Sequence, residues 1–194
     1  MSDQIIDEAY KLIKPIGKGG MATVYLAEVD ISKVNYTLLY AYTQVSGKTH
    51  TERVEKADTL ASKLKKSELD WKTIRRLLEV QKIPVPPQRV ALKLAHENVS
   101  IARFEDEWKY LICLNHPNVV KVFCGGVSEQ RPYYAMELLP EMISQKEIIE
   151  NFSVEEKLET ICMAGEGLDY LHKNGIVHRD IKPDNFITLK NSEG

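Results

Sequence analysis

The sequence predicts an α+β fold in which an antiparallel sheet precedes a mainly helical segment. Strand-like alternation on both sides of a glycine-rich turn, at residues 10–16 and 23–29, predicts a β-hairpin. Helical spacing of apolar residues predicts two amphipathic helices, at residues 100–114 and about 154–172, and Asn174-Gly175 ends the second. The remaining predicted strands are residues 90–93, 119–127, 131–138 and 186–189.

The composition is that of a globular protein without a large excess of either charge. Of the 194 residues, 43% are hydrophobic, and the net charge of -2 argues against a general nucleic-acid binder. The chain lacks a basic start followed by an apolar run and has no segment of membrane-spanning length, so we expect a cytoplasmic protein. Cys113, Cys124 and Cys162 lack metal-ligand spacing and are predicted to be buried thiols in a reducing compartment.

The densest group of chemically active residues is the segment His178-Arg179-Asp180-Ile181-Lys182-Pro183-Asp184-Asn185. Asp180 can accept a proton from an attacking hydroxyl, and Lys182 can hold negative charge on a phosphoryl group during transfer. Asn185 offers an oxygen ligand to a hard cation such as magnesium. Together these groups are the parts that phosphoryl transfer needs, because the protein mainly positions groups and stabilises charge in that reaction.

This segment resembles the catalytic loop of protein kinases, H-R-D-x-x-x-x-N, and Lys182 is typical of the serine/threonine branch. The resemblance implies an antiparallel-sheet small lobe with helix C at residues 10–139 and the start of a helical large lobe at residues 140–194. It also implies transfer of the gamma-phosphate of ATP to a protein Ser or Thr hydroxyl, with ATP and Mg²⁺ as cofactors. Asn185 would be the metal ligand.

Two further motifs carry the same resemblance. Gly17-Lys18-Gly19-Gly20-Met21-Ala22-Thr23-Val24 resembles the glycine-rich loop that covers the phosphates, although Ala22 replaces its third glycine. Val90-Ala91-Leu92-Lys93 resembles the strand whose lysine reaches the phosphates and pairs with a glutamate of helix C. Helical geometry favours Glu107 as that glutamate, because it shares the inward face with Leu111, and Glu105 is the second choice.

Met136 takes the gatekeeper position, and the backbones of Glu137 and Leu139 are expected to bond the adenine edge. The full set of residues expected at the nucleotide is Ile16, Gly17, Lys18, Gly19, Gly20, Ala22, Val24, Ala91, Lys93, Met136, Glu137, Leu139 and Ile187.

Residues 31–88 form an insertion that most kinases lack between the second and third strands. We predict a strand at Tyr36–Val45, a helix at Thr51–Lys65 and a second helix from a capping-box-like Ser67 through Lys82. Residues 48–89 hold eleven Lys and Arg against six Asp and Glu, so the segment is locally basic. We favour a helical hairpin with its polar side in water over a docking surface for an acidic partner or a membrane face.

The sequence ends before the D-F-G segment that follows the catalytic loop in kinases, so we expect a C-terminally incomplete kinase. The apolar stripe of the helix at about residues 154–172 would then lack its cover, which predicts self-association. The alternative is a catalytically inactive kinase remnant that acts as a nucleotide-binding or scaffold module. The intact Asp180, Lys182, Asn185 and Lys93 argue against that alternative, and Lys182 also argues against a small-molecule phosphotransferase.

Overall fold

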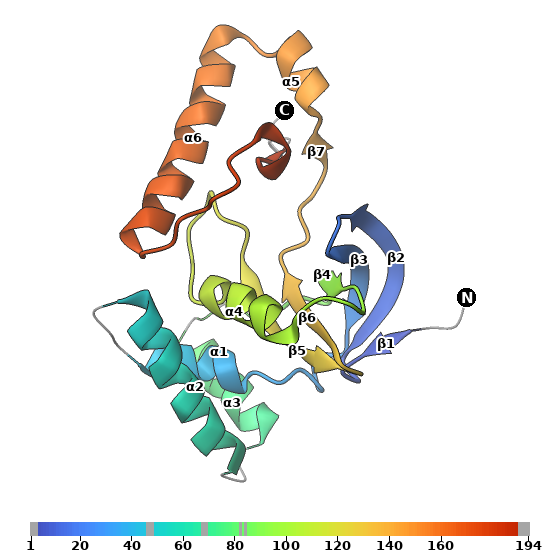
Figure 1. The fold of residues 1–194 in the computed structure, drawn as a ribbon, viewed down its shortest axis with the longest axis vertical. Helices are drawn as coiled ribbons and strands as arrows, with labels where there is room; N and C mark the ends of the chain where they lie inside the picture. Colours follow the sequence, from blue (N-terminus) through green and yellow to red (C-terminus); the bar gives the residue numbers. More distant parts are fainter. Residues whose placement is uncertain (1–3, 46–48, 67–69, 82, 84, 190–194) are drawn as a thin grey trace. The chain divides into compact units, whose positions relative to one another are not determined.

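A computed structural model describes residues 4–45, 49–66, 70–81, 83 and 85–189. The chain divides into two compact units: residues 1–115 with 121–138, and residues 116–120 with 139–194. Among the described residues, no helix is both long and apolar enough to cross a membrane. The elements are labelled in Figure 1, and each unit is described by itself.

The first unit is built on a six-stranded antiparallel sheet in the order β1-β2-β3-β4-β6-β5. Its strands are β1 Ile5–Ile6, β2 Tyr10–Lys18, β3 Ala22–Val29, β4 Arg89–Ala95, β5 Val122–Ser128 and β6 Arg131–Met136. The predicted β2–β3 hairpin and the strands at residues 90–93, 119–127 and 131–138 are therefore confirmed, with β5 beginning three residues later than predicted.

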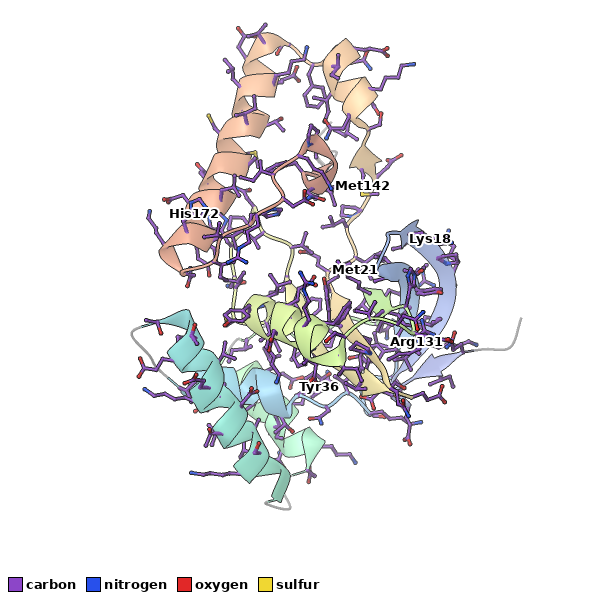
Figure 2. The ribbon with its side chains drawn as sticks, viewed as in Figure 1. Lys18, Met21, Tyr36, Arg131, Met142 and His172 are labelled. Atoms are coloured by element: carbon purple, nitrogen blue, oxygen red, sulfur yellow. The ribbon has the colours of Figure 1, made fainter. Side chains whose placement is uncertain are left out.

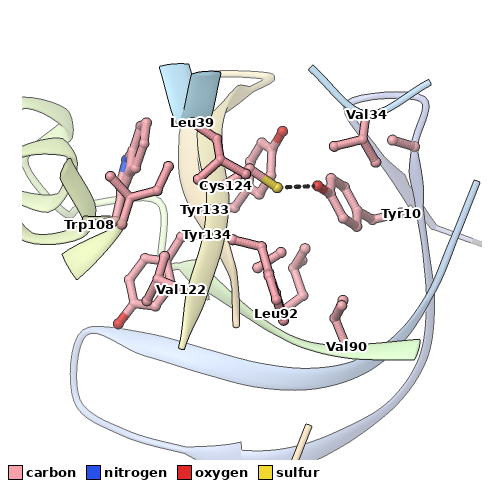
Figure 3. Packing of buried hydrophobic residues seen from close by; sticks show 14 of the residues in the cluster. Tyr10, Val34, Leu39, Val90, Leu92, Trp108, Val122, Cys124, Tyr133 and Tyr134 are labelled. Carbon is pink, nitrogen blue, oxygen red and sulfur yellow. Dashed lines mark hydrogen bonds between the residues drawn. The ribbon is translucent and has the colours of Figure 1, made fainter. Parts of the chain in front are cut away.

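The sheet curls until its two edges are joined by side chains. Asp7, which follows the edge strand β1, donates its backbone N–H to Ser128 of the opposite edge strand β5, and Tyr133 donates to the Asp7 carboxylate. Inside the curl, the Tyr10 hydroxyl lies 2.7 Å from the Cys124 sulfur. Figure 3 marks this hydrogen bond with a dashed line. The aliphatic core around this contact, including Val90 and Leu92, is fully buried.

The insertion is helical throughout its described elements: α1 Thr37–Gln44, α2 His50–Lys66 and α3 Trp71–Val80. The predicted helix at Thr51–Lys65 is confirmed, and the predicted strand at Tyr36–Val45 is wrong. Because α1 contacts α2, α3 and β5, it buries apolar residues on several sides, and such a short run carries no period that separates helix from strand. The second helix begins at the cap Asp70, which accepts from the Thr73 N–H; Ser67 and Lys82 lie outside the described residues.

One helix of the first unit, α4 Ile101–Leu111, is the predicted helix C. The Ser100 side chain accepts from the Arg103 N–H at its start. Just past its end, the Lys121 ammonium donates to the carbonyls of Ile112 and Leu114 at 3.2 and 2.8 Å. Side chains thus bond the backbone at the start of the helix and in the segment just past its end.

The second unit contains α5 Gln145–Asn151 and α6 Val154–Lys173, followed by the 3₁₀ turn η1 Pro183–Asn185, and a small sheet of β7 Met142–Ile143 with β8 Thr188–Leu189. A capping box of Ser153 and Glu156 starts α6. Asn174 ends it, and Gly175 follows with a left-handed φ of 76°. The predicted helix and its stop are confirmed.

The outer face of α6 is apolar and exposed. Val154, Leu158 and Ile161 expose 67%, 57% and 66% of their surface. Cys162 lies beside them and is exposed, so the prediction that all three cysteines are buried is wrong for this residue. The exposure of Val154, Leu158 and Ile161 agrees with the prediction that this stripe lacks a cover, although helical spacing alone does not show whether anything packs on it.

Candidate active site

The first group of candidate residues lies on one row across the curled sheet. The strand registers place Gly17 of β2 opposite Val24 of β3, Val24 opposite Lys93 of β4, and Lys93 opposite Tyr134 of β6. Opposed residues of an antiparallel sheet point to the same face. The side chains of Val24, Lys93 and Tyr134 therefore share a face, next to the glycine that enters the turn.

Lys93 is held by a carboxylate from α4. Its ammonium lies 2.7 Å from Oε1 of Glu107, and the two side chains are 25% and 39% exposed. The same ammonium lies 5.1 Å from the ring centre of Tyr134 and 5.5 Å from that of Phe104, within cation–π range. Glu107, preferred over Glu105 from the sequence, is thus the carboxylate that the structure places against Lys93.

Tyr134 is a member of this site that the sequence analysis did not single out. Its hydroxyl donates to the same Glu107 oxygen at 2.9 Å. Burial, and then the charge of Glu107, raise the pKa of Tyr134, so its hydroxyl remains a donor over the physiological range. The alternation of β6 could indicate a facing side chain, but only the β4–β6 register shows that it faces Lys93.

The glycine-rich turn is closed by its own backbone. The Gly19 N–H donates to the Ala22 carbonyl at 2.9 Å. Figure 2 labels Lys18, at the end of β2, and Met21, next to Ala22. A Cβ added at Gly20 would have no atom within 4 Å, so the outer side of the turn is open. Ala22 is buried and pairs with Ala95 of β4, so its methyl group points into the sheet packing. The replacement of the family's third glycine therefore does not narrow the open side of the turn.

His96 is a second residue that the sequence analysis did not single out. Its ring nitrogens lie 3.2 Å from the Gly20 carbonyl and 3.0 Å from the Thr23 hydroxyl, and its backbone N–H donates to the Met21 carbonyl. The turn is thus tied to the end of β4 at three points. In the sequence, His96 falls just after the lysine strand and outside any motif.

The second group of candidate residues is the loop after α6. Nζ of Lys182 lies 2.9 Å from Oδ2 of Asp180, and Nδ2 of Asn185 donates to the same oxygen at 3.0 Å and to the Asp180 carbonyl at 2.7 Å. The bond from Lys182, and then that from Asn185, hold the pKa of Asp180 below its ordinary value. Arg179 precedes it with a left-handed φ of 63°, a conformation unusual for a residue other than glycine.

The amide orientation of Asn185 bears on the predicted metal site. Because its Nδ2 points at Asp180, its Oδ1 is the amide atom that can meet a cation. The described residues contain no group of three or more His, Cys, Asp or Glu that could hold a metal ion. The residues present therefore fit a magnesium ion that takes some of its ligands from nucleotide phosphates, which is how magnesium is usually bound. They do not fit a site in which protein atoms supply all the ligands.

The expected adenine residues divide between the units. Ala91 is buried on β4 and pairs with Met136 of β6, both in the first unit. The Glu137 N–H donates to the Lys121 carbonyl at 2.8 Å, so Glu137 can read a base only through its own carbonyl. In the second unit, Leu139 follows at the start of the connection to β7, and Ile187 is exposed before β8. Ile16 and Lys18 are exposed on β2.

Comparison with known proteins agrees with the fold and the motifs. Residues 87–193, more than half of the chain, match the family model described as the protein kinase domain. The chain therefore belongs to the protein kinase family. The relatives described here are named as serine/threonine-protein kinases. It is 27% identical over 187 residues to the probable serine/threonine-protein kinase PknB of Lactococcus lactis, covering 95% of this chain and 22% of that protein.

A second relative is the serine/threonine-protein kinase PknB of Mycolicibacterium smegmatis, 31% identical over 106 residues, which are 51% of this chain and 17% of that protein. Among solved structures, this chain is similar to the kinase domain of Mycobacterium tuberculosis PknI, with a TM-score of 0.58 and 18% sequence identity. The match covers 97% of this chain and 58% of the PknI chain. This likeness shows the fold and confirms the predicted kinase-like α+β class. The chain thus spans about a fifth of the length of the curated relatives.

Proposed function

We propose that this chain supplies the nucleotide-binding and phosphoryl-transfer residues of an ATP-dependent serine/threonine protein kinase. The observation that carries the proposal is the Lys93–Glu107 pair at 2.7 Å, held between a sheet strand and α4 with Tyr134 on the same carboxylate. A fixed ammonium beside an open glycine-rich turn suits the polyphosphate of a nucleotide. In this proposal residues 10–139 are the small lobe and residues 140–194 the beginning of the large lobe.

The second group of residues would act on the phosphate acceptor. The Asp180 carboxylate would accept the hydrogen bond of a substrate hydroxyl and take its proton as the new O–P bond forms and the bond to ADP breaks. Since hydrogen bonds from Lys182 and Asn185 lower its pKa, Asp180 is a weak base. Its main contribution would be to orient the hydroxyl. The Lys182 ammonium, 2.9 Å from Asp180, would carry charge next to the transferred group.

Magnesium, when bound, would neutralise phosphate charge, and Asn185 would hold it together with phosphate oxygens. The substrate class, a protein hydroxyl of Ser or Thr, is proposed from Lys182 and from the serine/threonine kinases to which the chain is similar. Recognition of the base would use the Glu137 carbonyl, because its N–H is already bonded to Lys121.

The test is transfer of labelled phosphate from ATP to casein, using the longest polypeptide that the gene encodes. Asp180→Asn should lower kcat at least a hundredfold, since it removes the carboxylate that would orient the substrate hydroxyl and accept its proton. Asp169→Asn is the matched control, because Asp169 pairs with Lys173 on the surface of α6 at 2.6 Å and should leave transfer unchanged. Lys93→Met should chiefly weaken ATP binding, with Lys33→Met, which removes an exposed partner of Asp30, as its control.

Equal activity of Asp180→Asn and wild type would refute the assignment. Binding of ATP without any transfer by the wild type would favour a nucleotide-binding module that lacks catalysis.

A further inference from the structure

The insertion packs on the helix that carries Glu107. Helix α2 contacts α4, and Asp58 of α2 forms an ion pair with Lys109 of α4 at 3.1 Å, with the side chains 39% and 23% exposed. Ala57 and Ala61 of α2 are also buried, so the insertion is packed against the rest of its unit around this pair. The pair thus connects residues that are far apart in sequence across a packed interface.

Three successive residues of α4 point to three different supports. Consecutive helical residues are turned by about 100° from one another. Glu107 reaches Lys93 of β4, Trp108 lies on β5 where a Cβ at Gly125 would approach its ring to 2.6 Å, and Lys109 reaches Asp58 of the insertion. Because these contacts come from different directions, together they fix the rotation of the helix about its axis.

A charged residue of α2 also lies within electrostatic range of the segment past the end of α4. Burial raises the pKa of Cys113 to about 11, and the nearby guanidinium of Arg53 offsets part of that rise. Arg53 belongs to α2 and lies five residues before Asp58. These observations place α2 beside the last turn of α4, where Lys109 lies, and near the segment that follows it.

We propose that the insertion is a built-in brace for α4, in which Asp58 and Lys109 are positioning residues that hold the helix where Glu107 reaches Lys93. The catalytic consequence rests on the proposed kinase function, but the brace itself does not. Loss of the pair leaves the part-buried Lys109 without its carboxylate, so the helix gains rotational freedom and the Lys93–Glu107 pair is populated less. The insertion thereby contributes to the site without touching its substrates.

Amide hydrogen exchange of α4 tests the brace without any need for catalysis. In the full chain without nucleotide, Asp58→Lys places two ammonium groups together and should speed exchange in residues 101–111 about fivefold, as expected for loss of a pair of this exposure. The double variant Asp58→Lys with Lys109→Asp restores the attraction and should restore slow exchange. Glu79→Lys is the matched control, because Glu79 pairs with Arg75 within α3 and should leave α4 unchanged.

Kinetics separate bracing from general stability. Where transfer is measurable, Asp58→Asn should raise KM for ATP several-fold with a smaller change in kcat, since Lys93 acts on the nucleotide phosphates. Wild-type exchange rates in the α4 of Asp58→Lys, or failure of the double variant to restore them, would overturn the brace even in an active kinase. If the double variant restores slow exchange but the wild type transfers no phosphate, the brace would be supported and the proposed kinase function refuted.

Discussion

Substitution of Gly125 by alanine should displace α4 and weaken the Lys93–Glu107 pair. The added Cβ would lie 2.6 and 2.8 Å from two ring atoms of Trp108 and 2.8 Å from the Tyr133 carbonyl. Carbon atoms normally pack at about 3.5–4.0 Å, so the ring must retreat by about 1 Å. Trp108 is only 3% exposed and has no free space to enter, so the helix has to move with it.

The expected destabilisation is about 1–3 kcal/mol, the usual range for overpacking a core. Because Glu107 precedes Trp108 directly, a shift of about 1 Å would lengthen its 2.7 Å contact with Lys93 beyond hydrogen-bond range. Thermal unfolding should report a loss of about 2–4 °C per kcal/mol. Hydrogen exchange in residues 101–111 should rise at the same time.

Gly126→Ala is the neighbouring control, since its Cβ would meet only the Tyr133 side chain, at 3.1 Å from the hydroxyl, and should be milder. Adding Trp108→Phe to Gly125→Ala removes ring atoms from the crowded side, so the double variant should lose less stability than the sum of the two single losses. Wild-type stability and unchanged α4 exchange in Gly125→Ala would refute the close packing on which this reasoning depends.

Three further outcomes follow from the geometry. In α6, Gly165→Ala should stabilise by about 0.5–1 kcal/mol, because nothing lies within 4 Å of the new Cβ. Gly167→Ala in the same helix should destabilise, because its Cβ would lie 2.7 Å from the Asn118 carbonyl; equal melting temperatures for the two variants would contradict this. Iodoacetamide should label exposed Cys162 in the native chain and reach buried Cys124 only on unfolding, as mass spectrometry of the peptides can show. Burial raises the pKa of Cys124 to about 12, so above about pH 9 the folded state keeps a proton that the unfolded thiol loses. The free energy of unfolding, measured by urea titration, should therefore fall from about pH 9 upward, and it should fall less steeply in Cys124→Ala.

Local motifs in the sequence were sufficient for the strands, for α6 and for the choice of Glu107. Each depends on residues close together in the chain: alternation beside a glycine turn, an apolar stripe ended by Asn174-Gly175, or a carboxylate on the inward face of a helix. Tyr134 and His96 could not be found this way. Their contacts with Glu107 and the turn depend on the registers of β3, β4 and β6, which bring distant residues together.

The insertion was harder to predict, because its conformation depends on the surface it covers. Residues 36–45 were predicted to form a strand, yet this run forms α1 against α2, α3 and β5. The charge excess suggested an appendage with a solvated face. The structure also buries Val34, Tyr36 and Leu39, which precede that basic segment, in the same core cluster as the sheet. The acidic partner considered for this basic segment stays a prediction.

Burial of the insertion explains how a long connection fits between two paired strands. β3 and β4 stay in register over seven residue pairs although residues 30–88 separate them. Lengthening a loop costs only about 0.6 kcal/mol per doubling, roughly 2 kcal/mol for this connection relative to a short turn. One buried leucine contributes about 1.5–3 kcal/mol, so Leu39 alone offsets that closure entropy.

The same burial decides how the brace must be tested. Deleting the insertion would uncover the core around Tyr10 and Cys124, which Val34 and Leu39 cover (Figure 3). Loss of activity after such a deletion would therefore report unfolding as readily as a freed α4. Asp58 lies at the edge of this core and is 39% exposed, so its replacement changes the contact with Lys109 while leaving the apolar cover in place. A point substitution at the ion pair can thus separate the position of Glu107 from the stability of the sheet.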